Sequence, residues 1–145
     1  MSTEIKGGVA AGAKGAGGTF LWNVWILNKA YEEARGILNE TQYDYVAAQV
    51  QSLATEADPT HSQLCSVDAI GDFHELREKH GVLGKINLRV FFFLDHLRRA
   101  IVIIGAFKKE NNGPTPPATV ITMTRRKSLY EGGEITLPPY TNRQR

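Results

Sequence analysis

The stretch FHELREKHGVLGKINLRVFFFLDHLRRAIVIIGAFKK, residues 73–109, decides the fold because it contains three consecutive segments with the pattern of β-strands. In the middle segment, residues 86–94, the even positions are all apolar, whereas the odd positions place Arg89 among aromatic rings. Successive side chains of a strand point to opposite faces, so one face is apolar and the other is not simply solvated. Residues 73–77 also alternate, and residues 100–107 are almost continuously apolar, as in a strand covered on both faces.

The connection between the first two segments predicts a pair of like charges. If residues 78–88 close symmetrically about Leu83, Arg77 lies opposite Arg89 on the neighbouring strand. Two like charges that face each other destabilise a sheet. A protein keeps such a pair for an anion, or screens it with a carboxylate such as Glu75.

Charge is distributed unevenly along the chain. Residues 74–109 hold eight lysines and arginines against three acids, whereas residues 1–73 hold four against nine, within a net charge of +2. A hairpin that turns near residues 96–98 also places Lys109 close to Lys85 at one end of the sheet. A basic sheet face is typical of nucleic-acid binding. The alternative is that Lys and Arg at exposed strand ends only discourage edge-to-edge aggregation.

The other segments complete one α+β domain over residues 20–130, in the order β-α-α-β-β-β-α. A strand at residues 20–27 leads into a helix that Asn28 caps and that runs to residue 38. Thr41 and Asp44 resemble a capping box for a second helix. These helices form an N-terminal hairpin that packs against a small antiparallel sheet, mixed at one edge. A last helix begins near Pro116, with Thr115 as its cap.

The two ends of the chain differ from this domain in composition. Residues 7–18 are almost entirely glycine and alanine, so residues 1–19 are expected to be a flexible leader. Residues 131–145, with Gly-Gly and Pro-Pro, are expected to be a disordered tail. The leader lacks the apolar core of a signal peptide, and no stretch reaches the roughly 18 apolar residues of a membrane span. We therefore expect a cytoplasmic protein with no membrane partner.

Cysteine usage limits the chemistry. The single cysteine, Cys65, excludes an internal disulfide and offers no cysteine cluster to a metal. We expect it to be a packed or loop thiol. No metal and no small-molecule cofactor are expected.

Four ordered motifs resemble the RelE/ParE superfamily of toxins, and specifically its phage-derived, HigB-like subgroup: FHELR at 73–77, INLRVFFF at 86–93, IVIIGAFKK at 101–109 and TPPATVITM at 115–123. Members of this subgroup have a strand that ends in Leu-Arg, an Arg-Val/Ile-aromatic strand, a strand that closes with Phe-x-Lys-Lys, and a helix begun by Thr-Pro. Residues 22–40, WNVWILNKAYEEARGILNE, are similar to the family's first strand and helix. The resemblance covers about residues 21–130 and implies a RelE-like fold.

The resemblance implies a type II toxin that acts as a ribosome-associated, metal-independent mRNA endonuclease (mRNA interferase) and inhibits translation. Its partners would be the ribosome, mRNA and a cognate antitoxin of helix-turn-helix type. Cleavage beside a 2′-hydroxyl needs a base, cations for the phosphorane and a proton donor. The family's catalytic positions match four residues here: Arg77, Arg89, Lys108 and Lys109. We prefer Lys109 to Lys108, because alternation puts the two on opposite faces and Lys109 lies nearest the family's catalytic basic residue.

Further cations are expected to extend the RNA-binding surface. They are Lys79, Lys85, Arg125 and Arg126. One departure from the family concerns acid–base chemistry: several members use a tyrosine or histidine shortly after the last strand, but residues 110–117 read ENNGPTPP. Tyr130, His74 and His80 are the alternatives that the chain offers.

Two other functions stay open from the sequence. One is a gyrase-poisoning toxin like the ParE branch of the superfamily, which the missing tyrosine or histidine favours. The other is a non-catalytic, phage-borne module that binds nucleic acid or protein. In that case the leader and the tail would serve as tethers for a partner.

Overall fold

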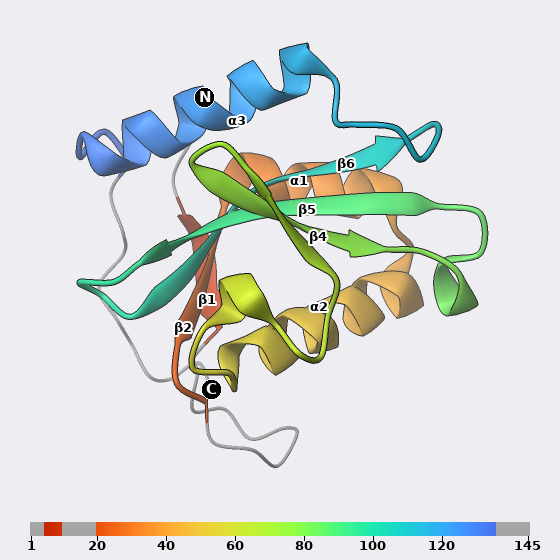
Figure 1. Cartoon of the computed structure of the whole chain (residues 1–145), viewed down its shortest axis with the longest axis horizontal. Helices are drawn as coiled ribbons and strands as arrows, with labels where there is room; N and C mark the ends of the chain where they lie inside the picture. Colours follow the sequence, from red (N-terminus) through yellow and green to blue (C-terminus); the bar gives the residue numbers. More distant parts are fainter. Residues whose placement is uncertain (1–4, 10–19, 136–145) are drawn as a thin grey trace.

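The computed structural model describes residues 5–9, by their backbone alone, and residues 20–135. The chain folds as an α+β structure whose strands and helices are shown in Figure 1. Its strands are β1 (Ile5–Val9), β2 (Asn23–Leu27), β3 (Val67–Ile70), β4 (Phe73–Glu78), β5 (Asn87–Asp95) and β6 (Ala100–Lys109). Its helices are α1 (Asn28–Ile37), α2 (Glu40–Ala54) and α3 (Pro117–Glu131), with short 3₁₀ turns η1 (Pro59–His61) and η2 (Gly81–Leu83).

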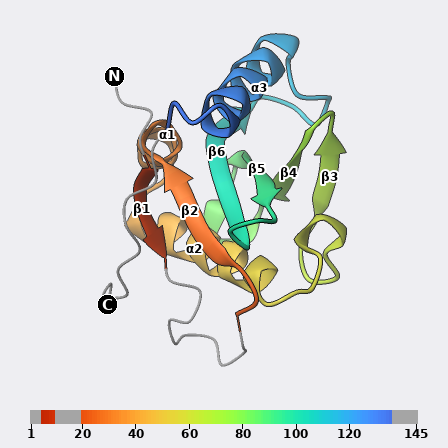
Figure 2. The same ribbon diagram turned by 90° about the vertical axis from the view of Figure 1, so that its left-hand side faces the viewer.

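The strands form one sheet in the order β1-β2-β6-β5-β4-β3. Strand β2 runs parallel to β6, and the other neighbouring pairs are antiparallel. Figures 1 and 2 show α3 on one side of the sheet and α2 on the other. The predicted fold class is confirmed: a mainly antiparallel sheet, mixed toward one edge, packs against an N-terminal helical hairpin.

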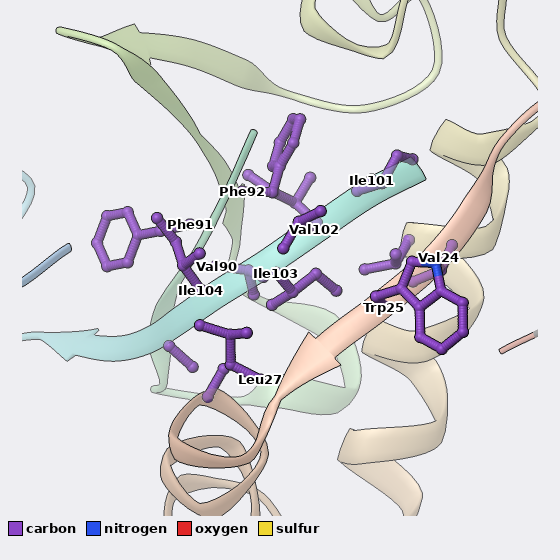
Figure 3. Close-up of a cluster of buried hydrophobic side chains, with 14 of the residues drawn as sticks. Val24, Trp25, Leu27, Val90, Phe91, Phe92, Ile101, Val102, Ile103 and Ile104 are labelled. Atoms are coloured by element: carbon purple, nitrogen blue, oxygen red, sulfur yellow. The ribbon is translucent and has the colours of Figure 1, made fainter. Parts of the chain in front are cut away.

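Burial explains the patterns of β5 and β6. Every residue of β6 from Ala100 to Ala106 is buried, and β5 is buried on both faces from Leu88 to Phe93. Figure 3 shows side chains of β2, β5 and β6 packed into this core. The core therefore runs through the centre of the sheet, with helices on either side of it.

A small residue lets α3 approach the sheet closely. A Cβ on Gly105 of β6 would lie 2.3 Å from the sulfur of Met123, which is far inside van der Waals contact. The pairing of β5 and β6 shifts register next to Gly105: Phe91 pairs with Gly105, whereas Phe92 pairs with Ile103. The bulge at Ile104 thus separates the two halves of β6.

The structure corrects several predicted boundaries. The predicted order omitted β3, which alternates poorly because its two central residues are both exposed. The predicted first strand starts at Asn23 instead of residue 20. Strand β1 lies within the predicted leader, and Ile135, in the predicted tail, is only 4% exposed. The rest of the leader and tail, residues 1–4, 10–19 and 136–145, falls outside the described residues.

Three predicted helix caps are wrong. Helix α1 includes Asn28 and has Leu27 at its N-cap, without a side-chain hydrogen bond. Asn39 caps α2 and forms a capping box with Gln42, so Thr41 lies inside the helix. Helix α3 begins at Pro117 with Pro116 at its N-cap, and the Thr115 hydroxyl bonds Glu75 instead of capping the helix. Each cap moved by one or two residues, the usual error of boundary prediction from sequence.

Candidate anion-binding site

Arg77 and Arg89 face each other across β4 and β5. They are direct partners in the strand register, as a loop symmetric about Leu83 predicted. Leu83 itself is 1% exposed and anchors η2 in the middle of that connection. Arg89 is only 2% exposed, whereas the side chain of Arg77 is 38% exposed. The sheet therefore holds one buried and one accessible guanidinium side by side.

The Glu75 carboxylate joins the two arginines. Its Oε2 accepts hydrogen bonds from Arg77 Nε at 3.1 Å and from Arg89 Nη1 at 3.0 Å. Its Oε1 accepts the hydroxyl of Thr115 at 2.7 Å. Glu75 is itself 2% exposed, so these contacts lie where water screens charge weakly. Of the two explanations that the sequence left for an arginine pair, the structure shows the screening carboxylate.

A second carboxylate balances the charge at the surface. Asp68 of β3 forms an ion pair with Arg77, with its Oδ2 3.1 Å from Nη1, and its side chain is 54% exposed. Two arginines thus contact two carboxylates. One donor is still left over: within the described part of the chain, Arg89 Nε is buried and has no hydrogen-bond partner. The Glu75 carboxylate bonds Arg77, Arg89 Nη1 and Thr115 but does not reach this donor.

The two lysines at the end of β6 have different surroundings. Lys109 is 7% exposed, and its Nζ donates to the Pro114 carbonyl at 2.8 Å. This bond ties the loop before α3 to the sheet. Lys108 is exposed and pairs in the register with Leu88, which packs toward α1 and α2. The sequence predicted that Lys109 lies near Lys85, but the register places it opposite Asn87. The bulge at Ile104 contributes to this difference, because it shifts the pairing of β5 and β6 by one residue.

A cleft of about 370 Å³ opens beside the arginine pair. Its donor-bearing wall consists of Arg77, Lys79, Asn87, Arg89 and Asn112. Lys79 Nζ donates to Asn112 Oδ1 at 3.2 Å, and Asn87 Nδ2 donates to the Asn111 carbonyl at 3.0 Å. The β4–β5 connection and the loop that leads into α3 are therefore bonded to each other. Figure 1 shows both at the right-hand end of the sheet.

The opposite wall of the cleft is less cationic. Glu78 lines it at 7% exposure and accepts hydrogen bonds from Tyr45 and Gln49 of α2. Cys65 also lines the cleft, and burial raises the pKa of its thiol to about 11. A thiol with so high a pKa is almost entirely protonated near neutral pH and is a poor nucleophile.

The four cations expected to bind RNA do not gather in one place. Lys79 lines the cleft, and Lys85 is exposed in the nearby β4–β5 connection. Arg125 is exposed on α3. Arg126 instead forms a two-pronged ion pair with Glu33 of α1, at 3.0 Å and 2.7 Å, and its side chain is 12% exposed. Arg126 is therefore paired with a carboxylate of the protein itself and is separate from the cleft.

None of the three acid–base alternatives lines this cleft. The Tyr130 hydroxyl donates to Asp95 Oδ2 at 2.7 Å, and burial raises its pKa. His74 stacks on Phe92 and lines a separate cleft of about 380 Å³, where burial lowers its pKa. His80 is exposed in the β4–β5 connection. The side chains that line the cleft include the cationic hydrogen-bond donors Arg77 and Lys79, but no imidazole or phenol that could transfer a proton.

Comparison with known proteins adds no assignment. A scan against protein-family models and a search of curated proteins found no match to this chain. Within the described residues, no cluster of three or more His, Cys, Asp or Glu side chains could hold a metal ion, and no helix has the length and apolar character to cross a membrane. The geometry of the cationic wall itself suits an anion with several oxygens.

Proposed function

We propose that this protein is a type II toxin that cleaves mRNA at the ribosome and is neutralised by a cognate antitoxin, as its resemblance to the HigB-like subgroup implies. The observation that carries the proposal is the cross-strand pair of Arg77 and Arg89, which opens onto a cleft with Lys79. Guanidinium groups bind phosphate oxygens in pairs, so this wall suits an RNA backbone. Preorganised cations also stabilise the charge that a phosphorane develops.

The two arginines would have different tasks in this proposal. Arg77 is accessible and would contact a phosphate directly, together with Lys79. Arg89 is buried and paired with Glu75, so a phosphate would feel its field and would contact it only after Glu75 moves away. Lys109 would position the loop that carries Thr115, since it bonds the adjacent carbonyl of Pro114.

A second candidate, a gyrase-poisoning toxin, is favoured by one observation. The cleft wall contains no histidine or tyrosine, so an obvious proton donor for the leaving oxygen is missing from it. Gyrase poisoning requires binding without RNA cleavage. A non-catalytic binding module would use the same cationic wall and also needs no proton donor.

Induced expression in a bacterium, with mRNA 5′ ends mapped during growth arrest, tests the proposal. The test variant is Arg77→Ala/Lys79→Ala, because both side chains reach solvent and their loss spares the core. Arg98→Ala is the matched control, since Arg98 is an exposed arginine at the opposite end of the sheet. Arg89→Ala is unsuitable, because it leaves the buried Glu75 without its main partner.

The expected result is growth arrest with new 5′ ends inside translated frames, abolished by Arg77→Ala/Lys79→Ala and kept by Arg98→Ala. Arrest with DNA-damage signalling and intact mRNA would replace the nuclease by the gyrase poison. If the wild-type protein accumulates without arrest, the binding module becomes the better description.

A further inference from the structure

We propose that Glu75 occupies the place of a substrate phosphate in the resting protein, and that Thr115 holds it there as a latch. The inference rests on the proposed function in one respect, namely that the site receives a phosphate. It adds that the site is closed by the protein's own carboxylate. An incoming anion must therefore displace Glu75 before it can contact both arginines.

The contacts of Glu75 are those expected of a bound anion. One oxygen bridges Arg77 Nε and Arg89 Nη1, at 3.1 Å and 3.0 Å. The other oxygen is held by the Thr115 hydroxyl at 2.7 Å. A buried carboxylate between two guanidiniums offsets part of their charge and so lowers their attraction for a second anion.

The orphaned donor shows that the carboxylate is an incomplete ligand. Arg89 Nε is buried and unpaired, although a buried donor without a partner is costly. A phosphate has more oxygens than a carboxylate and could accept from Arg77, Arg89 Nη1 and Arg89 Nε together. The arginine pair is thus better matched to the larger anion than to Glu75.

The loop before α3 is the movable part of this latch. Thr115 belongs to that loop, and besides its bond to Glu75 the loop is held to the sheet through Lys109 Nζ and the Pro114 carbonyl. Asn111 and Asn112, in the same loop, bond to Asn87 and Lys79 beside the cleft, and Asn111 also accepts the Gly113 N–H within the loop. An anion that enters beside Lys79 reaches these bonds first, and their loss would free Thr115 to release Glu75.

Phosphate titration tests the latch without any requirement for RNA cleavage. The probe is inorganic phosphate, and the readout is the arginine Nε–Hε NMR signals of the full chain, which report directly on Arg77 and Arg89. Thr115→Val removes the hydroxyl that holds Glu75 and preserves the shape of the side chain. Thr122→Val is its matched control, since that hydroxyl bonds only the Ala118 carbonyl on exposed α3.

Removing the carboxylate charge is the second variant. Glu75→Gln keeps the shape of the side chain and frees the arginines for phosphate. Glu110→Gln removes the same charge from an exposed residue next to Lys109, and so corrects for the change in overall charge. A folded Glu75→Gln variant is recognised by a native-like backbone amide spectrum. If it does not fold, Thr115→Val decides the question alone.

We expect Thr115→Val to bind phosphate about threefold more tightly than the wild type, and Glu75→Gln about tenfold more tightly. The controls should match the wild type. Unchanged or weaker affinity in a folded Thr115→Val protein would overturn the latch, as would the absence of a saturable shift in every variant. Failure of the nuclease would instead show as intact mRNA while the phosphate affinities still rise in this order.

Discussion

At the scale of single residues, the Glu75 carboxylate holds Arg77, Arg89 and Thr115 together. The symmetric loop placed Arg77 opposite Arg89 correctly, and Glu75 was named as a possible screen. The roles of Thr115 and Asp68 were missed. Thr115 bonds Glu75 across a separation of 40 positions, for which no local pattern exists, and Asp68 contacts Arg77 from β3, the strand that the predicted order omitted.

His74 supplies a prediction at this scale. Burial against Phe92 holds the pKa of His74 below its ordinary value, so the unfolded chain takes up a proton at a higher pH than the folded protein does. Folding stability should therefore fall as the pH drops below about 6.5, and recover as the pH rises. We expect His74→Gln to reduce this dependence, measured as the free energy of unfolding in urea between pH 5 and pH 7.

His80→Gln is the control for this measurement, because His80 is exposed in the β4–β5 connection. It should keep the pH dependence of the wild type. An identical slope in the wild type and in His74→Gln would show that another group causes the acid sensitivity.

At the scale of elements, strong periodic patterns were predicted well and weak ones were lost. Strands β5 and β6 were recognised because their apolar positions are many and regular. Strand β3 was lost because it is four residues long and half exposed. The bulge at Ile104 also escaped prediction, because the apolar run of β6 shows no break in its pattern at that position.

The ion pair between α1 and α3 has a structural reason that the sequence did not reveal. Strand β2 pairs with β6 only as far as Ile103, since the chain then turns into α1. Glu33 accepts the free Ala106 N–H at 3.0 Å, and Arg126 donates to the free Ile104 carbonyl at 2.7 Å. These two side chains therefore complete the hydrogen bonding of β6 where its neighbouring strand ends.

Arg126→Met should destabilise the protein because it leaves the Glu33 carboxylate and the Ile104 carbonyl with fewer partners. We expect a loss of about 2 kcal/mol in the free energy of unfolding, below the range for a fully buried pair because Glu33 is partly exposed. Chemical denaturation monitored by circular dichroism measures this. Arg125→Met, on the exposed side of α3, should change stability by less than about 0.5 kcal/mol. Equal effects of the two substitutions would contradict this role for Arg126.

At the scale of the whole molecule, the division into an acidic and a basic half is partly cancelled by pairing. Asp68 from the acidic half contacts Arg77, and Glu33 contacts Arg126 of α3. Net charge along the sequence therefore overstated the free positive surface. The cations that stay exposed at the cleft end of the sheet include Lys79, Lys85 and Lys108.

If RNA binds over this end of the sheet, its affinity should depend on salt. Each phosphate that a lysine neutralises contributes about −0.7 to the slope of log K against log salt for a single strand. Lys79→Gln and Lys85→Gln should each reduce the slope by about that amount, measured by fluorescence anisotropy with a 2′-O-methyl RNA that cannot be cleaved. Arg98→Gln, at the opposite end, should leave the slope unchanged. Equal slopes for all three variants would place the RNA elsewhere.

The carboxylate shared by Arg77 and Arg89 also limits how this chain can vary in evolution. Loss of either buried partner alone leaves a charge stranded away from water, whereas loss of both together leaves none. Glu75 and Arg89 are therefore exchangeable as a pair but not one at a time. The exposed Asp68, which contacts Arg77 at the surface, is less constrained, because water can solvate the charge that its loss would leave. A lineage that drifts by single substitutions would keep the buried pair even after its original function had been lost.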